Sequence, residues 1–343
     1  MIPIQNIYYM LSYAFQVLNE QGYKNIATEQ FNNTGELMAA ILEKGIAIQL
    51  KRGLGKEYIP QTEALSSLRG KIDIAESIKT QSMLRKQLIC TYDEFSVNSI
   101  MNQIIKSTVE LLLRSNISKQ RKKNLRKLMV YFSEVDFIDS YTVNWNVQYN
   151  RNNQTYRMLI SICYLVVKGL LQTQSNGHTK LMDFLDEQRM CRLYEKFILE
   201  YYRKEFKNQI TANASQIPWQ LDNEENSMLP VMQSDIMLQS GEKVLIIDAK
   251  YYEHSTQVQF DKHTLHSGNL YQIFTYVKNK EYELREKDHT VSGMLLYAKT
   301  DEEIYPNNVY QMSGNQITVR TLDLNLPFDE IAGQLNTIAK THF

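Results

Sequence analysis

The stretch "SDIMLQSGEKVLIIDAKYY", residues 234–252, decides how the rest of the chain is interpreted. "SDIMLQ" and "KVLIID" are both typical of β-strands, and "SGE" between them is typical of a turn, so the stretch predicts a β-hairpin. The second strand ends unusually, because the apolar run "VLII" leads directly into Asp248-Ala249-Lys250. An apolar run of this kind favours a strand inside a sheet, and two ionisable side chains at its end require an explanation.

The register of this hairpin can be predicted from the turn. A turn centred between Gly241 and Glu242 sets Asp235 directly opposite Asp248. Directly opposite residues share a face of the sheet, and alternation along the strand places Lys250 on the same face as Asp248. The hairpin therefore predicts one surface that gathers Asp235, Asp248 and Lys250, and a shift of one residue would destroy it.

This combination of charges indicates metal-dependent chemistry. Two close carboxylates repel each other unless one is protonated or a cation lies between them, and carboxylate oxygens suit Mg²⁺. Such an ion would acidify a bound water and neutralise charge on a phosphodiester, and Lys250 would orient the water or stabilise the developing charge. Asp235 followed by Asp248-x-Lys250 across a hairpin is the PD-(D/E)xK nuclease arrangement, with Pro230 loosely placed ahead of it. The alternative is a strand that simply ends in a surface ion pair.

A helix is predicted for "GNLYQIFTYV" at 268–277, with Gln272 and Tyr276 four residues apart on one face. This spacing resembles the Gln-xxx-Tyr helix of RecB-like nucleases, which flanks the active site, and Gln272 is our fourth catalytic candidate. The alternative is an ordinary amphipathic helix in which Tyr276 belongs to the core.

A second helix, "CRLYEKFILEYY" at 191–202, precedes the hairpin. Glu195 lies at the edge of its apolar face and is our candidate for a third metal ligand. Glu200 is the alternative, and either residue could instead be a solvated helix charge.

Composition restricts the class of protein. The chain has 343 residues and equal numbers of acidic and basic side chains, so a nucleic-acid contact must come from a local patch. Its three cysteines are far apart and show no metal-ligand spacing, which favours reduced thiols in a cytoplasmic protein. The N-terminus lacks the features of a signal peptide, and no apolar stretch is long enough for a membrane span.

Periodicity predicts the order of the elements. We expect helices over 5–20 and 34–50, strands within 51–97, and a helix beginning near 98 that turns Ile100, Ile104, Val109 and Leu112 toward the core. Helices over 157–173 and about 181–207 follow, then strands from about 217. The polar segment "YNRNNQTYR" at 149–157 is the best candidate for a domain boundary. The predicted class is α/β or α+β, with strands covered by helices.

At the level of the whole chain the sequence resembles the McrC family, the nuclease subunits of McrBC modification-dependent restriction systems. The resemblance is carried by "IPIQNIYYMLSYA" at the start, "LRGKID" at 68–73, "YDEFSVNSIMNQIIKST" at 92–108, "LYEKF" at 193–197, and the segments from "SDI" through "IIDAKYY" to "NLYQIFTY".

The resemblance implies two domains. Residues 1–152 would form an N-terminal partner-docking domain of helices and a β-barrel-like part. Residues 153–343 would form a PD-(D/E)xK endonuclease domain with a central mixed sheet flanked by helices, in which Asp235, Asp248 and Lys250 match the catalytic positions. The expected partner is a hexameric McrB-like AAA+ GTPase, whose GTP hydrolysis the chain stimulates and which reads modified cytosine in double-stranded DNA. In keeping with this, the chain has no G-x-x-x-x-G-K-[ST] motif, so GTP is expected on the partner.

Several features remain open at this stage. "KQRKKNLRK" at 119–127 carries six basic residues in nine and would contact DNA, a protein partner or only solvent. His254, His263 and His266 are expected to be polar loop residues, and Tyr251 and Tyr252 to pack beneath the site. The alternative to a nuclease is a catalytically silent adaptor that only activates a GTPase.

Overall fold

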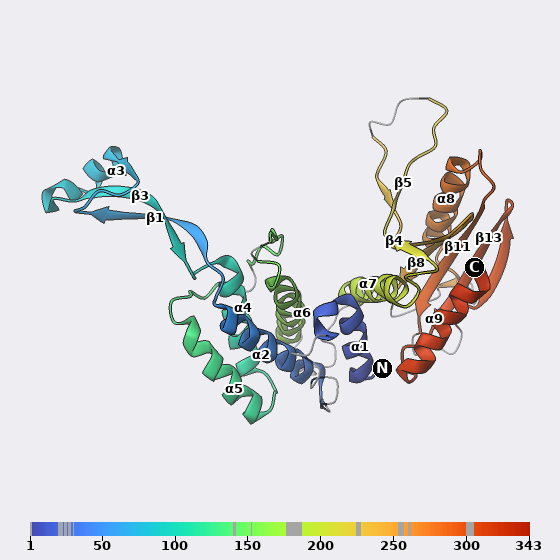
Figure 1. The fold of residues 1–343 in the computed structure, drawn as a ribbon, viewed down its shortest axis with the longest axis horizontal. Helices are drawn as coiled ribbons and strands as arrows, with labels where there is room; N and C mark the ends of the chain where they lie inside the picture. Colours follow the sequence, from blue (N-terminus) through green and yellow to red (C-terminus); the bar gives the residue numbers. More distant parts are fainter. Residues whose placement is uncertain are drawn as a thin grey trace. The chain divides into compact units, whose positions relative to one another are not determined.

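The computed structural model describes residues 2–19, 23, 26, 29, 31–139, 142–151, 153–175, 187–223, 228–252, 257–259, 262–299 and 305–343. The chain divides into two compact units (Figure 1). Unit 1 consists of residues 1–27 together with 185–343, and unit 2 consists of residues 28–184.

Unit 1 is built on a six-stranded mixed sheet with the strand order β12-β13-β11-β8-β7-β4. Strands β8, β11 and β13 are parallel, whereas β4, β7 and β12 pair antiparallel with their neighbours. The strands are β4 (Thr211–Asn213), β7 (Ile236–Ser240), β8 (Lys243–Lys250), β11 (Thr290–Ala298), β12 (Asn308–Met312) and β13 (Asn315–Leu322). Short two-stranded pairs are formed by β5 (Gln216–Ile217) with β6 (Met232–Gln233) and by β9 (Gln257–Gln259) with β10 (Lys262–Thr264).

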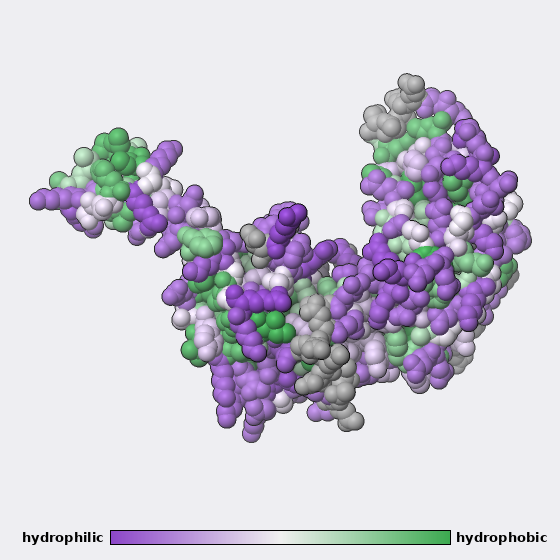
Figure 2. Space-filling model, viewed as in Figure 1, coloured by the Kyte–Doolittle hydropathy of each residue, from purple (hydrophilic) through white to green (hydrophobic). Residues whose placement is uncertain are grey.

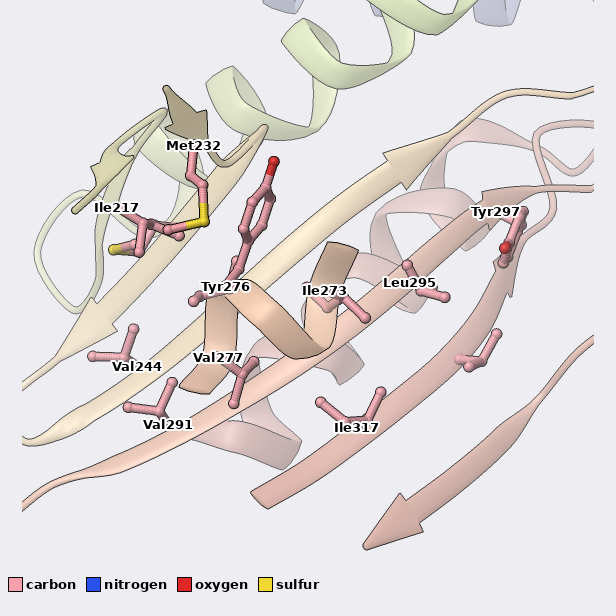
Figure 3. Packing of buried hydrophobic residues seen from close by; sticks show 13 residues of the cluster. Ile217, Met232, Val244, Ile273, Tyr276, Val277, Val291, Leu295, Tyr297 and Ile317 are labelled. Carbon is pink, nitrogen blue, oxygen red and sulfur yellow. The ribbon is translucent and has the colours of Figure 1, made fainter. Parts of the chain in front are cut away.

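Four helices of unit 1 accompany this sheet: α1 (Ile4–Ala14), α7 (Glu187–Glu205), α8 (Ser267–Glu283) and α9 (Phe328–His342), with a short 3₁₀ helix η1 (Gln16–Asn19) after α1. α8 lies against β8 and β11, α7 against β4, β7 and β8, and α9 against β13. Figure 3 shows Ile273 and Val277 of α8 directed at the sheet, where they meet Val244, Val291 and Ile317. The sheet with helical cover confirms the predicted mixed α/β class.

Close packing of α8 on the sheet depends on Gly293 of β11. A Cβ atom at this position would lie 2.8 Å from Val277 Cγ2 and 2.9 Å from Ile273 Cγ1, distances that real Cβ contacts do not show. The missing side chain therefore lets the helix sit directly on the strand. This contact fixes the height of α8 above the sheet.

The N-terminal helix α1 belongs to unit 1, although the sequence predicted it in the N-terminal domain. The Tyr13 ring packs against Phe197, Tyr201 and Phe328, with ring centroids 5.3–5.7 Å apart. The buried Asn6 side chain also donates hydrogen bonds to the carbonyls of Leu324 (2.7 Å) and Leu326 (2.8 Å). Aromatic packing and satisfied polar groups thus tie the first residues to the last helix.

Unit 2 has a helical core made by α2 (Thr34–Arg52), α4 (Ile100–Arg114), α5 (Lys119–Met129) and α6 (Tyr156–Ser175). A short 3₁₀ helix, η4 (Val130–Phe132), directly follows α5. Tyr156, at the start of α6, is buried, and its hydroxyl donates to Asn102 Oδ1 (2.8 Å) and accepts from Gly55 N (2.7 Å). α6 packs on α2 and α4, so it belongs with unit 2. The observed division lies near residue 184, about thirty residues after the predicted boundary at 152/153.

A three-stranded antiparallel sheet projects from these helices (Figure 1). It contains β1 (Glu57–Leu65), β2 (Lys71–Asp73) and β3 (Leu88–Ser96) in the order β1-β3-β2, with the short helices α3 (Ile74–Lys79) and η3 (Ser82–Arg85) between β2 and β3. We call residues 57–96 the arm. In the described residues of unit 2 this open sheet takes the place of the predicted barrel-like part.

Most sequence-based element predictions are confirmed. The helix over 34–50 corresponds to α2, the helix over 157–173 to α6, and the helix over 268–277 lies within α8. The prediction for Ile100 was wrong, because this first residue of α4 is 36% exposed, whereas Ile104, Val109 and Leu112 are buried. Within the described part of the chain, no helix combines the length and apolarity that a membrane span requires.

Candidate active site at the end of strand β8

The hairpin has the predicted register. Ile236 of β7 pairs with Ile247 of β8, and a two-residue turn of Gly241 and Glu242 joins the strands. Asp235 lies one residue before β7, and its Oδ2 accepts a hydrogen bond of 2.9 Å from the backbone N–H of Ala249. This bond holds the Asp235 carboxylate beside the end of β8, next to Asp248.

Asp248 is buried, with 1% of its surface exposed. Its Oδ2 lies 2.9 Å from Lys250 Nζ, yet among the described residues neither carboxyl oxygen has a hydrogen-bond partner of good geometry. Burial, opposed by Lys250 and reinforced by Asp235, raises the pKa of Asp248 from 3.8 to about 7. A buried carboxyl beside a second carboxylate is energetically unfavourable even with one lysine nearby, and coordination of a cation would relieve it.

The Lys250 amine lies next to the Asp248 carboxylate and is also contacted by Gln272 of α8. Burial alone would lower the pKa of Lys250, but the Asp248 carboxylate and, after it, Asp235 raise it above its usual value, so the amine stays charged. Lys250 Nζ also lies 3.4 Å from Gln272 Oε1, and Gln272 Nε2 donates to the Tyr276 hydroxyl at 2.9 Å. The Gln-xxx-Tyr pair of α8 therefore contacts Lys250 through Gln272.

Glu195 approaches the same strand end from α7. Burial and then the negative charge of Asp235 raise the pKa of Glu195, and its Oε1 accepts a hydrogen bond of 3.1 Å from Cys191 Sγ. The alternative, Glu200, forms an ion pair of 2.7 Å with Arg203 of the same helix. The contacts favour Glu195 over Glu200 as the acidic neighbour of the hairpin.

The candidate ligands suit a Mg²⁺ ion that keeps several waters better than an ion enclosed entirely by protein side chains. Among the residues with described placement, no three or more Asp, Glu, His or Cys side chains are arranged as a preformed metal site. Mg²⁺ keeps several waters and commonly uses only one or two protein carboxylates, which Asp235 and Asp248 supply. The buried carboxyl of Asp248, next to the Asp235 carboxylate and with a pKa raised by burial, is the observation that favours a cation here.

Cys191 is a neighbour of the site that the sequence reasoning missed. Its Sγ lies 3.1 Å from Glu195 Oε1 and 3.9 Å from the carbonyl oxygen of Ala249, and burial raises the pKa of its thiol to about 12. The protonated thiol acts as a hydrogen-bond donor to Glu195. The spacing of four residues between Cys191 and Glu195 on one helix face was the signal that could have identified it.

The aromatic residues after Lys250 pack as predicted. The Tyr251 ring lies edge-on to Tyr194, and the Tyr252 ring packs against His266 and Tyr297. His266 precedes α8 as its N-cap residue. His254 and the side chain of His263 lie outside the described residues.

Comparisons with known proteins identify the family of the chain. The family model for McrBC 5-methylcytosine restriction system components matches residues 5–298. The chain belongs to this family. It is 30% identical over 331 residues to the type IV methyl-directed restriction enzyme EcoKMcrBC of Escherichia coli K12, a match that covers 94% of this chain and 93% of that protein.

Two solved structures from Thermococcus gammatolerans are also similar. A half-complex of McrB AAA+ hexamers with bound McrC matches with a TM-score of 0.47 and 17% identity, covering 98% of this chain and 76% of that chain. The McrBC complex matches with a TM-score of 0.42 and 20% identity, covering 60% and 59%. The membership in the McrBC family depends on the sequence matches, and it confirms the resemblance inferred from the motifs.

Proposed function

We propose that the chain is the Mg²⁺-dependent endonuclease subunit of a restriction complex that cleaves double-stranded DNA carrying modified cytosine. The observation that supports this proposal is the buried Asp248 carboxyl group, which lies beside the Asp235 carboxylate at the end of β8, with Lys250 Nζ at 2.9 Å as its countercharge. The family of restriction system components to which the chain belongs supports DNA as the substrate. The PD-(D/E)xK pattern supports hydrolysis of a phosphodiester.

Each side chain has a separate task in this proposal. Asp235 and Asp248 would hold the metal, and Glu195 would be the third acidic residue beside it. When bound, Mg²⁺ acidifies a water molecule and neutralises charge on the phosphodiester. Lys250, charged and positioned by Gln272, donates a hydrogen bond to the attacking water or to the negatively charged oxygen of the transition state.

The partner in this proposal is a hexameric AAA+ GTPase of the McrB type, and the arm of unit 2 is its docking element. The end of the arm is covered by exposed apolar side chains: Leu68, Ile74, Ile78, Met83 and Leu84 are 54–81% exposed. Figure 2 shows this hydrophobic surface over the region labelled α3 in Figure 1. A cluster of this kind on a projecting segment is typical of a protein contact.

Polar bonds, not an apolar core, order the end of the arm. Asp73 caps α3 by accepting from Glu76 N (2.9 Å), and the buried Ser77 hydroxyl donates to Asp73 O (2.6 Å) and accepts from Ile89 N (2.8 Å). The apolar side chains of α3 and η3 are therefore left free to face outward. The proposed contact would also transmit stimulation of GTP hydrolysis, as the family resemblance implies.

The decisive experiment replaces Asp248 in the complex assembled with its GTPase partner. Asp248→Ala should reduce GTP-dependent cleavage of methylated DNA by about 10³-fold or more, while assembly and stimulated GTP hydrolysis remain. Asp248→Asn serves as the near-isosteric second variant if the alanine variant folds poorly. Cleavage that persists in both folded variants would exclude this active site.

A metal titration separates the nuclease from the alternative, a silent adaptor. The wild-type chain should bind Mn²⁺ or Mg²⁺ in a manner that Asp248→Asn weakens, because the carboxylate pair supplies the ligands. An adaptor that only uses the fold as a scaffold would show no carboxylate-dependent binding. Titration calorimetry on the purified chain measures this directly.

A further inference from the structure

The basic run at 119–127 forms the helix α5, and its two faces differ in charge balance. The inner face is anchored to α2 and to the segment before it: Arg121 forms ion pairs with Glu29 (2.7 Å), Glu36 (3.4 Å) and Glu43 (2.9 Å). Leu125, one turn further on, is fully buried. The charge of Arg121 is thus more than offset by three carboxylates, and the helix is fixed to the body of unit 2.

The outer face carries the other five basic residues. Their spacing of three and four residues places Lys119, Lys122, Lys123, Arg126 and Lys127 along one side of the helix. Four of them are exposed and Lys122 is partly buried, and none forms an ion pair with another residue in the described ranges. Figure 2 shows hydrophilic side chains over the region labelled α5 in Figure 1.

This arrangement is unfavourable for the helix by itself. Lys119 and Lys123, Lys122 and Arg126, and Lys123 and Lys127 are like charges four residues apart, which destabilise a helix. The first turn contains no acidic residue, so Lys119 there opposes the helix dipole. Five positive charges without an ion-pair partner among the described residues indicate a surface that binds an external anion.

The density of charge points to duplex DNA. From Lys119 to Lys127 the helix rises about 12 Å, so the outer face carries about one positive charge per 2.4 Å. Duplex DNA carries about one negative charge per 1.7 Å of its axis, a comparable linear density with regular spacing. The net charge of the whole chain is zero, so this face differs from the rest of the protein.

We propose that the outer face of α5 binds the phosphate backbone of duplex DNA without regard to sequence. The proposal deepens the proposed nuclease function, on which it rests for its substrate. Because the contact is made to phosphates, it positions the DNA and leaves recognition of the modified base to other groups. It would add affinity that decreases steeply with salt.

The test measures binding of a short, unmodified fluorescent duplex to the full chain by anisotropy, without divalent metal so that cleavage does not occur. The variant Lys119→Gln with Lys123→Gln and Lys127→Gln should bind at least about tenfold more weakly at low salt. The slope of log Kd against log salt concentration should decrease by about 2 to 3. The matching triple Lys→Arg variant at the same positions should bind like the wild type.

The matched control removes three exposed lysines of unit 1, as Lys207→Gln with Lys287→Gln and Lys340→Gln, for the same change in net charge. An equal loss of affinity in this control, or an unchanged salt slope in the α5 variant, would overturn the proposal. So would a selective loss of binding to the GTPase partner, which would assign the face to an acidic protein surface. The Asp248→Asn protein should bind the duplex normally, so failure of the nuclease proposal and failure of this one give different results.

Discussion

The sheet end of unit 1 and the arm of unit 2 depart in opposite ways from the pattern of most proteins, in which charged side chains are exposed and apolar side chains are buried. At the end of β8, Asp248 and Lys250 are charged groups with 1% and 14% of their side chains exposed. At the end of the arm, Ile78 and Leu84 are apolar residues that are 63% and 81% exposed. Buried charge and exposed hydrocarbon both oppose folding, and the proposed function assigns a bound ion to the first region and a protein partner to the second.

The difference lies in what each region lacks. The sheet end has more carboxylates than lysines, and a small cation can neutralise this excess negative charge. The arm has uncovered apolar surface on a projecting element, which only a macromolecule can cover. The following experiments test this contrast.

Asp235→Asn is expected to give the largest effect. The asparagine amide oxygen can still accept the hydrogen bond of Ala249 N–H, so the hairpin should keep its fold. Loss of one metal-binding charge should reduce cleavage in the assembled complex by about 10³-fold. Circular dichroism and thermal unfolding serve as folding controls, and a folded variant with near-normal cleavage would remove Asp235 from the site.

The double variant Ile78→Ser with Leu84→Ser should weaken binding to the GTPase partner by about 100-fold, because exposed apolar anchors contribute about 2 kcal/mol or more at interfaces. Its thermal stability should not fall, since these side chains make little of the core. Met228→Ser with Val231→Ser, two exposed apolar residues of unit 1, is the control and should bind the partner normally. Equal weakening in both variants would show that replacing any two exposed apolar residues with serine lowers the affinity, and would remove the arm as the docking element.

Metal affinity should depend on pH through Asp248, whose pKa is raised to about 7. Below about pH 7 the carboxyl holds a proton that the ion must displace, so affinity should rise about tenfold per pH unit and level off above it. Because the folded pKa lies above the unfolded value, this group lowers the stability of metal-free protein as pH rises from about 4 to about 7. Titration calorimetry with Mn²⁺ across this range checks the affinity, and a flat profile would contradict it.

Gly293→Ala should cause the smallest change, a loss of about 1–3 kcal/mol in the free energy of unfolding. The added Cβ would lie 2.8 Å from Val277 Cγ2 and 2.9 Å from Ile273 Cγ1, and would displace α8, which carries Gln272. Gly333→Ala in α9 is the control, because no atom lies within 4 Å of its added Cβ, and it should preserve or raise stability. Denaturant unfolding of both variants measures the difference.

Local pattern was sufficient to predict the hairpin. The turn residues Gly241 and Glu242 set the register, and alternation along the strands then brought Asp235 and Asp248 to one face. Helix spacing likewise related Gln272 to Tyr276, and the structure adds the contact with Lys250. These inferences succeeded because each depends on residues close together in the sequence.

The division into units could not be read from local pattern. The Tyr13 ring packs against Phe197 and Phe328, partners that lie far along the chain and leave no periodic signal near residue 13. Tyr156 similarly joins α6 to Gly55 and Asn102. A polar segment such as 149–157 marks a loop, whereas the boundary of a unit depends on where the helices after it find their partners.

The two-residue turn between β7 and β8 has a consequence for how this protein can vary over evolution. Gly241 occupies the left-handed backbone region, with a φ of 57°, and no atom lies within 4 Å of the position a Cβ would take. Exchanges of one residue for another there are restrained only by backbone preference. A single inserted or deleted residue would instead turn Asp235 away from Asp248, so natural relatives that cleave DNA should vary in the composition of this turn and keep its length.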